Sequence, residues 1–196
     1  MINYAGMKAE ESKGGESFGQ LPAGPYVAGI QNVKIDGVAP DQTLVLRVDV
    51  IEGEHAGYFT KRYQHDTQAS SGKYPVKYKG DYRLRIPHPQ SSSQYPDSDI
   101  RRMNDMIFRV ETSNPGFHWD GDETKLKGKI VGINMQEDEF NGISFTRIGR
   151  LETANDVRNG IVKAMKPRKR QEAQQAAPVL DAQTNFPIVE TDELPF

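Results

Sequence analysis

Cysteine is absent from this chain of 196 residues. Its absence excludes a disulfide framework, a thiolate nucleophile and any metal site built on cysteine. Long hydrophobic runs are also missing, because no stretch approaches the ~20 apolar residues that span a bilayer. The N-terminus carries no apolar signal segment either. We therefore expect a protein that has no membrane partner and works in a reducing intracellular compartment.

Basic residues are missing from the last part of the chain. Residues 171–196 contain five acids and no Lys or Arg, and the whole chain has a net charge of −2. Without this tail, the remaining 25 basic and 22 acidic residues give a net charge of +3. A mildly basic body joined to an acidic tail indicates that the body meets a polyanion and that the tail does not.

The first half of the chain predicts a flexible arm followed by strands. Residues 1–20 are polar and rich in Gly, Glu, Lys and Ser, which favours an arm. Alternation in "LPAGPYVAGIQNVKI" predicts a strand that is covered in part on both faces. The clearest strand is "TLVLRVDVIEG", in which Leu44, Leu46, Val48 and Val50 share one face. We expect "GYFTKRYQ", residues 57–64, to continue as a further strand.

The second half predicts more strands and one clear helix. From Lys73 to Ile86, aromatic and aliphatic residues alternate with cations, which predicts two short strands joined by a turn at "KGD", with Pro75 at a sheet edge. "DIRRMNDMIFRV" has apolar residues at helical spacing, with Ser98 or Asp99 as the cap and Asn114 as the stop. Residues 128–152 predict a hairpin around Asn141-Gly142, and a short helix is expected near 157–165. This order favours a mainly β fold, a small barrel with one helix.

The segment from Gly57 to Arg85 combines aromatic rings with positive charge. It holds six of the 17 aromatic residues and seven cations against two acids. Unpaired bases stack on flat rings and phosphates attract cations, so this mixture is typical of single-strand binding. The candidate contacts are Tyr58, Lys61, Arg62, Tyr63, Lys73, Tyr74, Lys77, Tyr78, Lys79, Arg83 and Arg85, with Arg147 added from the hairpin.

The tyrosines of this segment have a second interpretation. Tyr74, Tyr78 and Tyr82 alternate away from the cations, so each of them either packs in the core or stacks on a base. The sequence leaves both alternatives open, and it predicts exposure only for the cations on the odd-numbered positions.

A cluster of acids in "FHWDGDE" allows an enzymatic alternative. Asp120, Asp122 and Glu123 are residue types that a metal-dependent nuclease uses. The competing interpretation is a polar turn after the helix, with Phe117 and Trp119 packed inward. No phosphate-binding glycine loop and no recognisable nucleophile motif is present, so we expect neither an enzyme nor a cofactor.

The C-terminal "DELPF" resembles the tip of bacterial single-stranded DNA-binding proteins. In that family, acids precede an apolar residue, Pro and a terminal Phe, and the tip docks on replication and repair proteins. The resemblance implies that partners are bound by Asp192, Glu193, Leu194, Pro195 and Phe196. A buried aromatic joined to a charge-assisted contact would make a compact anchor on a disordered segment.

The body is similar to phage-encoded single-stranded DNA-binding proteins in "LPAGPYVAGI", "NPGFHWDGDETKLKGKIVG" and "RNG". This resemblance implies an OB-fold, a five-stranded Greek-key barrel with a helix between strands three and four. It implies a DNA-binding domain over residues 21–165, a disordered linker over 166–188 and an acidic tip over 189–196. The expected function is coating of single-stranded DNA during phage replication and recombination, in the cytoplasm of a bacterial host.

Two further possibilities stay open at this level. The body could bind protein instead of DNA, which would make the chain a recruitment adaptor that acts through its tip. The sequence also leaves homo-oligomerisation undecided, and with it the number of nucleotides that one protein covers.

Overall fold

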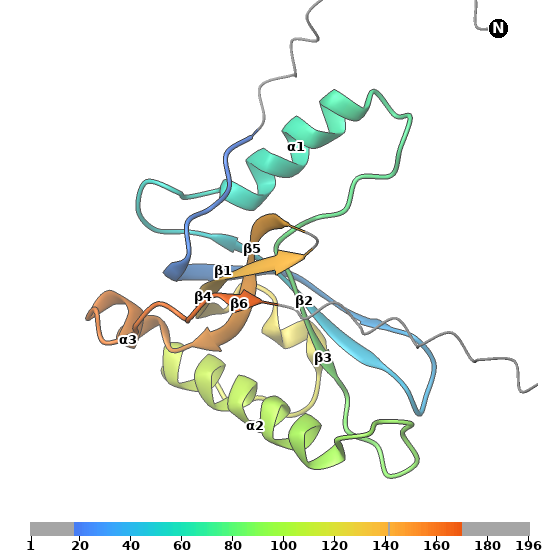
Figure 1. Cartoon of the computed structure of the whole chain (residues 1–196). Coiled ribbons are helices and arrows are strands. Elements are labelled where there is room, and N and C mark those ends of the chain that lie inside the picture. Colours follow the sequence, from blue (N-terminus) through green and yellow to red (C-terminus); the bar gives the residue numbers. More distant parts are fainter. Residues whose placement is uncertain (1–17, 141, 170–196) are drawn as a thin grey trace, which may run out of the picture.

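The computed structural model describes residues 18–140 and 142–169, and here the protein is mainly β. Five strands form one antiparallel sheet: β1 (Gly24–Asp36), β2 (Thr43–Val50), β3 (Asp81–Arg85), β4 (Ile130–Phe140) and β5 (Ile143–Glu152). The described helices are α1 (Tyr58–Ser70), α2 (Pro96–Ser113), α3 (Ala154–Arg158) and the 3-10 helix η1 (Glu123–Leu126). Helices α1 and α2 lie at opposite ends of the molecule, with the strands between them (Figure 1). The mainly β prediction is confirmed; α2 and α3 correspond to the two helices that the sequence predicted, and α1 is additional.

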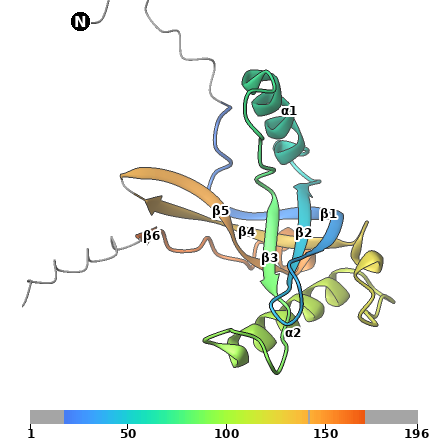
Figure 2. The same cartoon turned by 90° about the vertical axis from the view of Figure 1, so that its right-hand side faces the viewer.

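The sheet is open. Its strands follow the order β3-β2-β1-β4-β5, and the short β6 (Arg168–Lys169) pairs in parallel with β4. Within residues 18–140 and 142–169, no strand pairing joins β3 to β5. The five strands of the predicted barrel are therefore present, but in the described residues they do not close into a barrel. The β3 strand lies at a sheet edge, and the β4–β5 hairpin projects beyond the other strands (Figure 2).

Strand β2 confirms the alternation that the sequence predicted. Leu44, Leu46, Val48 and Val50 are all at most 2% exposed and belong to the central core. On β1, Ala28 and Ile30 are buried in the same core. Aliphatic side chains at every second position of these strands thus remove one continuous face from water, which is the main source of stability for such a sheet.

The segment "GYFTKRYQ" forms helix α1, so the predicted strand there is wrong. The buried carboxylate of Asp49, at the end of β2, accepts hydrogen bonds from the backbone N–H groups of Val50, Phe59 and Thr60 at 2.9, 2.9 and 3.1 Å. Two of these donors belong to the first turn of α1, whose N–H groups have no partner inside the helix. A carboxylate at this end also opposes the positive end of the helix dipole. The Asp49 side chain of β2 therefore caps this segment and makes it helical.

Only the end of the alternating segment 73–86 becomes a strand. Residues 73–80 form a connection that contains Pro75, and β3 starts at Asp81. Gly80 fixes where the strand begins, because the Val48 N–H donates to its carbonyl at 2.9 Å. The predicted strand before "KGD", with Pro75 at a sheet edge, is therefore wrong, and the strand after it, β3, occupies the edge instead.

Gly80 packs too tightly for a side chain. A Cβ at this position would lie 2.4 Å from the Val48 carbonyl oxygen and 2.8 Å from Cγ of Phe59. We expect Gly80→Ala to reduce the free energy of unfolding by about 1–3 kcal/mol, since overpacking forces backbone shifts. Gly19→Ala is the matched control, because a Cβ there meets nothing within 4 Å. Equal denaturation midpoints for the two variants in urea would contradict this packing.

Helix α2 and the hairpin confirm their predictions, with local differences. The helix begins at Pro96, earlier than the expected cap at Ser98 or Asp99, and ends before Asn114 as expected. Met106 is buried on its inner face, while Ile100 is exposed. The β4–β5 hairpin turns at Gly142, which has a φ of 74°, and Asn141 lies outside the described residues. The last helix, α3, starts earlier than the predicted 157–165 because Thr153 caps it through Asp156 N–H.

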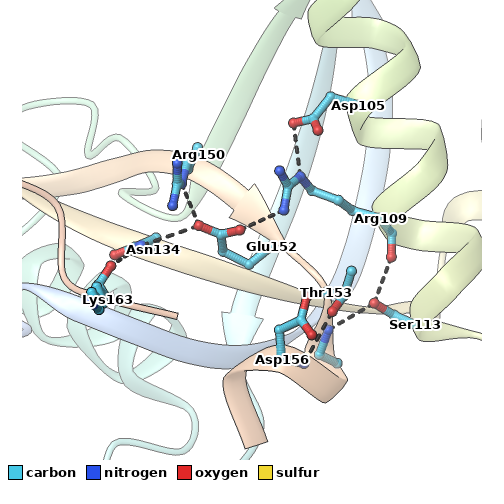
Figure 3. Close-up of polar contacts among 10 residues, drawn as sticks. Asp105, Arg109, Ser113, Asn134, Arg150, Glu152, Thr153, Asp156 and Lys163 are labelled. Atoms are coloured by element: carbon cyan, nitrogen blue, oxygen red, sulfur yellow. Dashed lines mark hydrogen bonds and ion pairs between the residues drawn. The ribbon is translucent and has the colours of Figure 1, made fainter. Parts of the chain in front are cut away.

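A buried ion-pair network joins α2 to the sheet (Figure 3). Glu152, at the end of β5, is 4% exposed. Its carboxylate pairs with Arg109 of α2 at 2.5 Å, with Arg150 of β5, and accepts from the buried amide of Asn134 at 3.3 Å. Asn134 also donates to the Lys163 carbonyl at 3.0 Å, so the network extends to the segment after α3. The helix is thereby fixed on the sheet by polar contacts as well as by its apolar face.

At both ends of the predicted DNA-binding domain, residues outside its boundaries contact the body. Phe18, assigned to the arm, packs its ring 5.4 Å from that of Tyr58, and Gln20 donates from its side-chain amide to the Ser144 carbonyl. At the other end, residues 168–169 of the predicted linker pair with β4. Residues 1–17 of the arm, residues 170–188 of the linker and the tip lie outside the described residues.

Candidate nucleic-acid interface

The outer face of strands β1, β2 and β3 carries four cations. The strand register places Lys34, Val45 and Arg83 in one row and brings Arg47 level with Asp81 in the next. Arg85 belongs to the row at the end of β3. Sequence reasoning found Arg83 and Arg85 but missed Lys34 and Arg47, because only the pairing of β1 and β2 with β3 brings them to the same face.

Acids compensate most of this charge. Arg47 pairs with Asp81 at 2.9 Å, Arg83 and Lys34 pair with Asp36 at 2.8 Å, and Arg85 lies 3.5 Å from Asp41. The hydrogen bonds from Lys34 and Arg83 lower the pKa of Asp36, so this carboxylate stays ionised. Four cations against three acids leave this face only weakly basic. It is therefore less attractive to phosphate than the sequence predicted.

A second basic surface lies between helix α1, Lys79 and strand β5. We call it the seam hollow, because it lies between α1 and the β4–β5 hairpin. Its volume is about 260 Å³. It is lined by Gln20, Tyr58, Phe59, Arg62, Lys79, Met135, Phe145, Thr146 and Arg147. Three of the lining residues are cations and no acid lines the hollow. Two of these cations, Arg62 and Arg147, pair with acids outside the lining, so Lys79 is the main charge offered to an anion.

Contacts with the body position the cations of the seam hollow. Arg62 donates to the Tyr58 hydroxyl at 3.0 Å and lies 3.6 Å from Asp66. Arg147 lies 2.8 Å from the buried carboxylate of Asp138. Neither Asp66 nor Asp138 lines the hollow, and a guanidinium with five N–H donors keeps donors for a further ligand. The two arginines are thus held in place for binding.

Lys79 differs from the two arginines. It is exposed, and no ion pair within the described residues involves it. A lysine with this freedom acts as a point charge that adapts to a phosphate. The structure thereby brings together four of the predicted contacts, namely Tyr58, Arg62, Lys79 and Arg147.

The tyrosines divide between the two alternatives that the sequence left open. Tyr58 is 7% exposed, and its hydroxyl binds Gly19 O at 2.8 Å and Leu21 N at 2.9 Å, so it serves the core. Tyr78 is half-buried, with its ring between Tyr63 and Arg47. Tyr74 is 73% exposed. Among the tyrosines of residues 57–85, Tyr63 and Tyr74 therefore expose the most ring area, while Tyr82 packs against the core. Of the two alternatives that the sequence left open, Tyr74 is available for stacking and Tyr82 belongs to the core.

The other lysines of the candidate set lie outside the seam hollow. Lys61 donates to the Ala56 carbonyl at 2.8 Å on α1. Lys73 and Lys77 are exposed on the connection before β3. None of the three lines the hollow.

The β4–β5 hairpin adds aromatic surface that sequence reasoning missed. Ile143, Phe145 and Arg147 alternate along β5 and share one face. Phe140 lies opposite Ile143, and the two side chains are 51% and 69% exposed. An apolar stripe therefore runs along the hairpin from its end to the seam hollow. The available signal was an apolar pair directly flanking an Asn-Gly turn, where solvent-facing polar residues are usual.

The acids of the nuclease alternative are used locally. Asp120 pairs with Lys125 at 2.5 Å, and this contact lowers the pKa of the Asp120 carboxyl group. Asp122 caps η1 by accepting from Thr124 N–H at 3.0 Å. In the described part of the chain, no group of three or more His, Asp or Glu residues is placed to hold a metal ion. Phe117 and Trp119 pack against the core, as the turn interpretation expected.

Comparison of the sequence with known family models and with curated proteins finds no match. Among the described helices, none has the length and apolar character needed to cross a bilayer. The tip residues 192–196 lie outside the described residues. The case for function accordingly depends on the seam hollow and the surfaces next to it.

Proposed function

We propose that this protein binds single-stranded DNA through the seam hollow and the adjoining hairpin stripe. The observation that carries the proposal is the lining of the hollow, to which Arg62, Lys79, Arg147 and the Phe145 ring contribute and no acid does. Cations neutralise phosphates, and each base that stacks on an aromatic ring gains roughly 1–3 kcal/mol. No chemical step is required, and the proposed role is to coat DNA during replication and recombination.

We propose an OB-type arrangement for the DNA-binding domain. In support of this, β1 pairs with both β2 and β4, and α2 lies between β3 and β4 in the chain. An OB-fold is a partly open Greek-key barrel that binds oligonucleotides on one face of its sheet. Lys79, two residues before β3, and Arg147 of β5 both line the seam hollow.

A fluorescence titration with poly-dT and with duplex DNA, each at two salt concentrations, tests the function. For each phosphate contact, the logarithm of the association constant falls by about 0.7 when the salt concentration rises tenfold. Several contacts therefore give a steep dependence on salt. We expect much tighter binding to poly-dT, since duplex bases are already stacked and unavailable to Phe140 and Phe145. Equal affinities for the two DNAs would overturn the proposal, and the recruitment adaptor would then be favoured.

The C-terminal tip is proposed to recruit replication and recombination proteins. Deleting residues 192–196, or replacing Phe196 with Ala, is expected to abolish recovery of such proteins in a pull-down from bacterial extract. A terminal aromatic often carries much of a short peptide's affinity. The affinity for single-stranded DNA should stay equal or rise slightly, because the deleted segment is acidic. Recovery of the same partners with all variants would refute the role of the tip.

A further inference from the structure

Arg47 is held rigidly on the outer face of the sheet. Its Nε and Nη2 atoms donate to the two carboxylate oxygens of Asp81 at 2.9 and 3.2 Å, which is the paired geometry that fixes a guanidinium plane. Its Cζ atom lies 4.6 Å from the ring centroid of Tyr78, over the ring. The guanidinium is therefore oriented by a carboxylate at its edge and by an aromatic ring on one face.

Tyr78 is itself a fixed support. Its hydroxyl donates to the Val48 carbonyl at 3.2 Å, and the Tyr63 ring packs against it with 5.8 Å between centroids. Burial raises the pKa of the Tyr78 hydroxyl to about 12, so it remains a neutral donor at all physiological pH values. Tyr78 thus lies against the tilted ring of Tyr63 and carries the Arg47 guanidinium over its own ring.

A small hollow adjoins this stack. Its volume is about 150 Å³, and its lining consists of Asn32, Lys34, Val45, Arg47 and Asp81. Val45 is almost fully buried and supplies an apolar surface, while the Arg47 side chain is 38% exposed. The Asn32 side chain is exposed, and no hydrogen bond within the described residues uses its amide. The hollow thus combines a flat cation, an apolar surface and a free amide.

We propose that this hollow is a subsite for one unpaired nucleobase. The base stacks on the guanidinium face of Arg47 that is turned away from Tyr78, and its edge meets the Asn32 amide. Lys34 is placed to approach the adjoining phosphate. The inference depends on the proposed single-strand binding and extends it from the seam hollow to the outer face of the sheet.

Charge decides between a base and a phosphate as the ligand of Arg47. Asp81 compensates the charge of the guanidinium through two hydrogen bonds, so a phosphate gains less from Arg47 than from Lys79, which takes part in no ion pair of the described residues. The flat face is unaffected by this pairing, and arginine stacks on bases through such a face. A paired arginine over a tyrosine is thus better suited to a base than to a phosphate.

The test compares an oligo-dT strand with an abasic strand of the same length. For Arg47→Ala we expect about tenfold weaker binding to oligo-dT, less than twofold change with the abasic strand, and an unchanged salt slope. Arg47→Lys keeps the positive charge but lacks the flat guanidinium group. Its affinity for oligo-dT should therefore fall nearly as much as that of Arg47→Ala. Asn32→Ala, which alters an exposed side chain, should weaken oligo-dT binding alone.

Arg83→Ala serves as the matched control, since Arg83 is also paired with an acid on this face but does not line the hollow. It should affect both strands equally and slightly. If Arg47→Ala weakens both strands equally and lowers the salt slope by about 0.7, Arg47 contacts a phosphate and the base subsite is refuted. If the unaltered protein does not prefer single strands to duplex, the proposed function itself fails.

Discussion

Combining Arg62→Gln with Lys79→Glu should weaken the binding of single-stranded DNA by roughly 100-fold in low salt. Each of the two residues offers a charge-assisted contact to phosphate, worth about 1.5 kcal/mol or about a factor of ten. The salt slope should fall by about 1.4, since two phosphate contacts are removed. Fluorescence titrations against poly-dT at several salt concentrations measure both the affinity and the salt slope.

The control carries the same change of charge at the opposite end of the molecule. Arg102→Gln combined with Lys127→Glu alters two exposed cations, one on α2 and one after η1, that do not line the seam hollow. Because exposed charges farther apart than about 10 Å are screened at 0.1 M salt, this variant should retain most of the affinity. Similar losses in the two variants would mean that total charge, and not the seam hollow, determines binding.

Glu152→Ala should reduce the free energy of unfolding by about 3 kcal/mol. The substitution removes a buried carboxylate and leaves Arg109 and the buried amide of Asn134 without their shared acceptor (Figure 3). Breaking a buried ion pair from one side costs about 3–5 kcal/mol, and the lower end applies because Arg109 remains 20% exposed. Urea denaturation followed by circular dichroism measures the change.

Asp105→Ala is the matched control for this network. Asp105 pairs with the same Arg109 at 2.9 Å, but its side chain is 47% exposed. Solvent-exposed pairs contribute at most about 1 kcal/mol, so this variant should remain close to the unaltered protein. A loss as large as that of Glu152→Ala would show that the stability depends on Arg109 alone and not on the buried carboxylate.

The seam hollow and the base subsite divide the two tasks of single-strand binding. Lys79 supplies a charge that no ion pair among the described residues compensates, whereas Arg47 supplies a flat surface whose charge Asp81 compensates. The salt-dependent part of the DNA affinity would then come mainly from the cations of the seam hollow. Base stacking on Arg47 and on the hairpin stripe would be nearly independent of salt. The two variant series above separate these contributions.

The sequence by itself determined the elements that follow a strict local pattern. The alternation of Leu44, Leu46 and Val48 on β2, the helical spacing in α2 and the turn at Gly142 each depend on neighbours within a few residues. The mainly β character and the basic, aromatic nature of residues 57–85 follow from such patterns and from composition. These features need no knowledge of which strands pair.

Only the tertiary structure decided the remaining features. Helix α1 forms where the sequence predicted a strand, because Asp49 of β2, nine residues before the helix begins, caps its first turn. The grouping of Lys79 with Arg147, and of Arg47 with Asn32, arises from strand pairing between distant segments. The ion pairs that weaken the predicted basic face also join separate strands. Contacts of this kind depend on distances in space, which the order of residues along the chain does not specify.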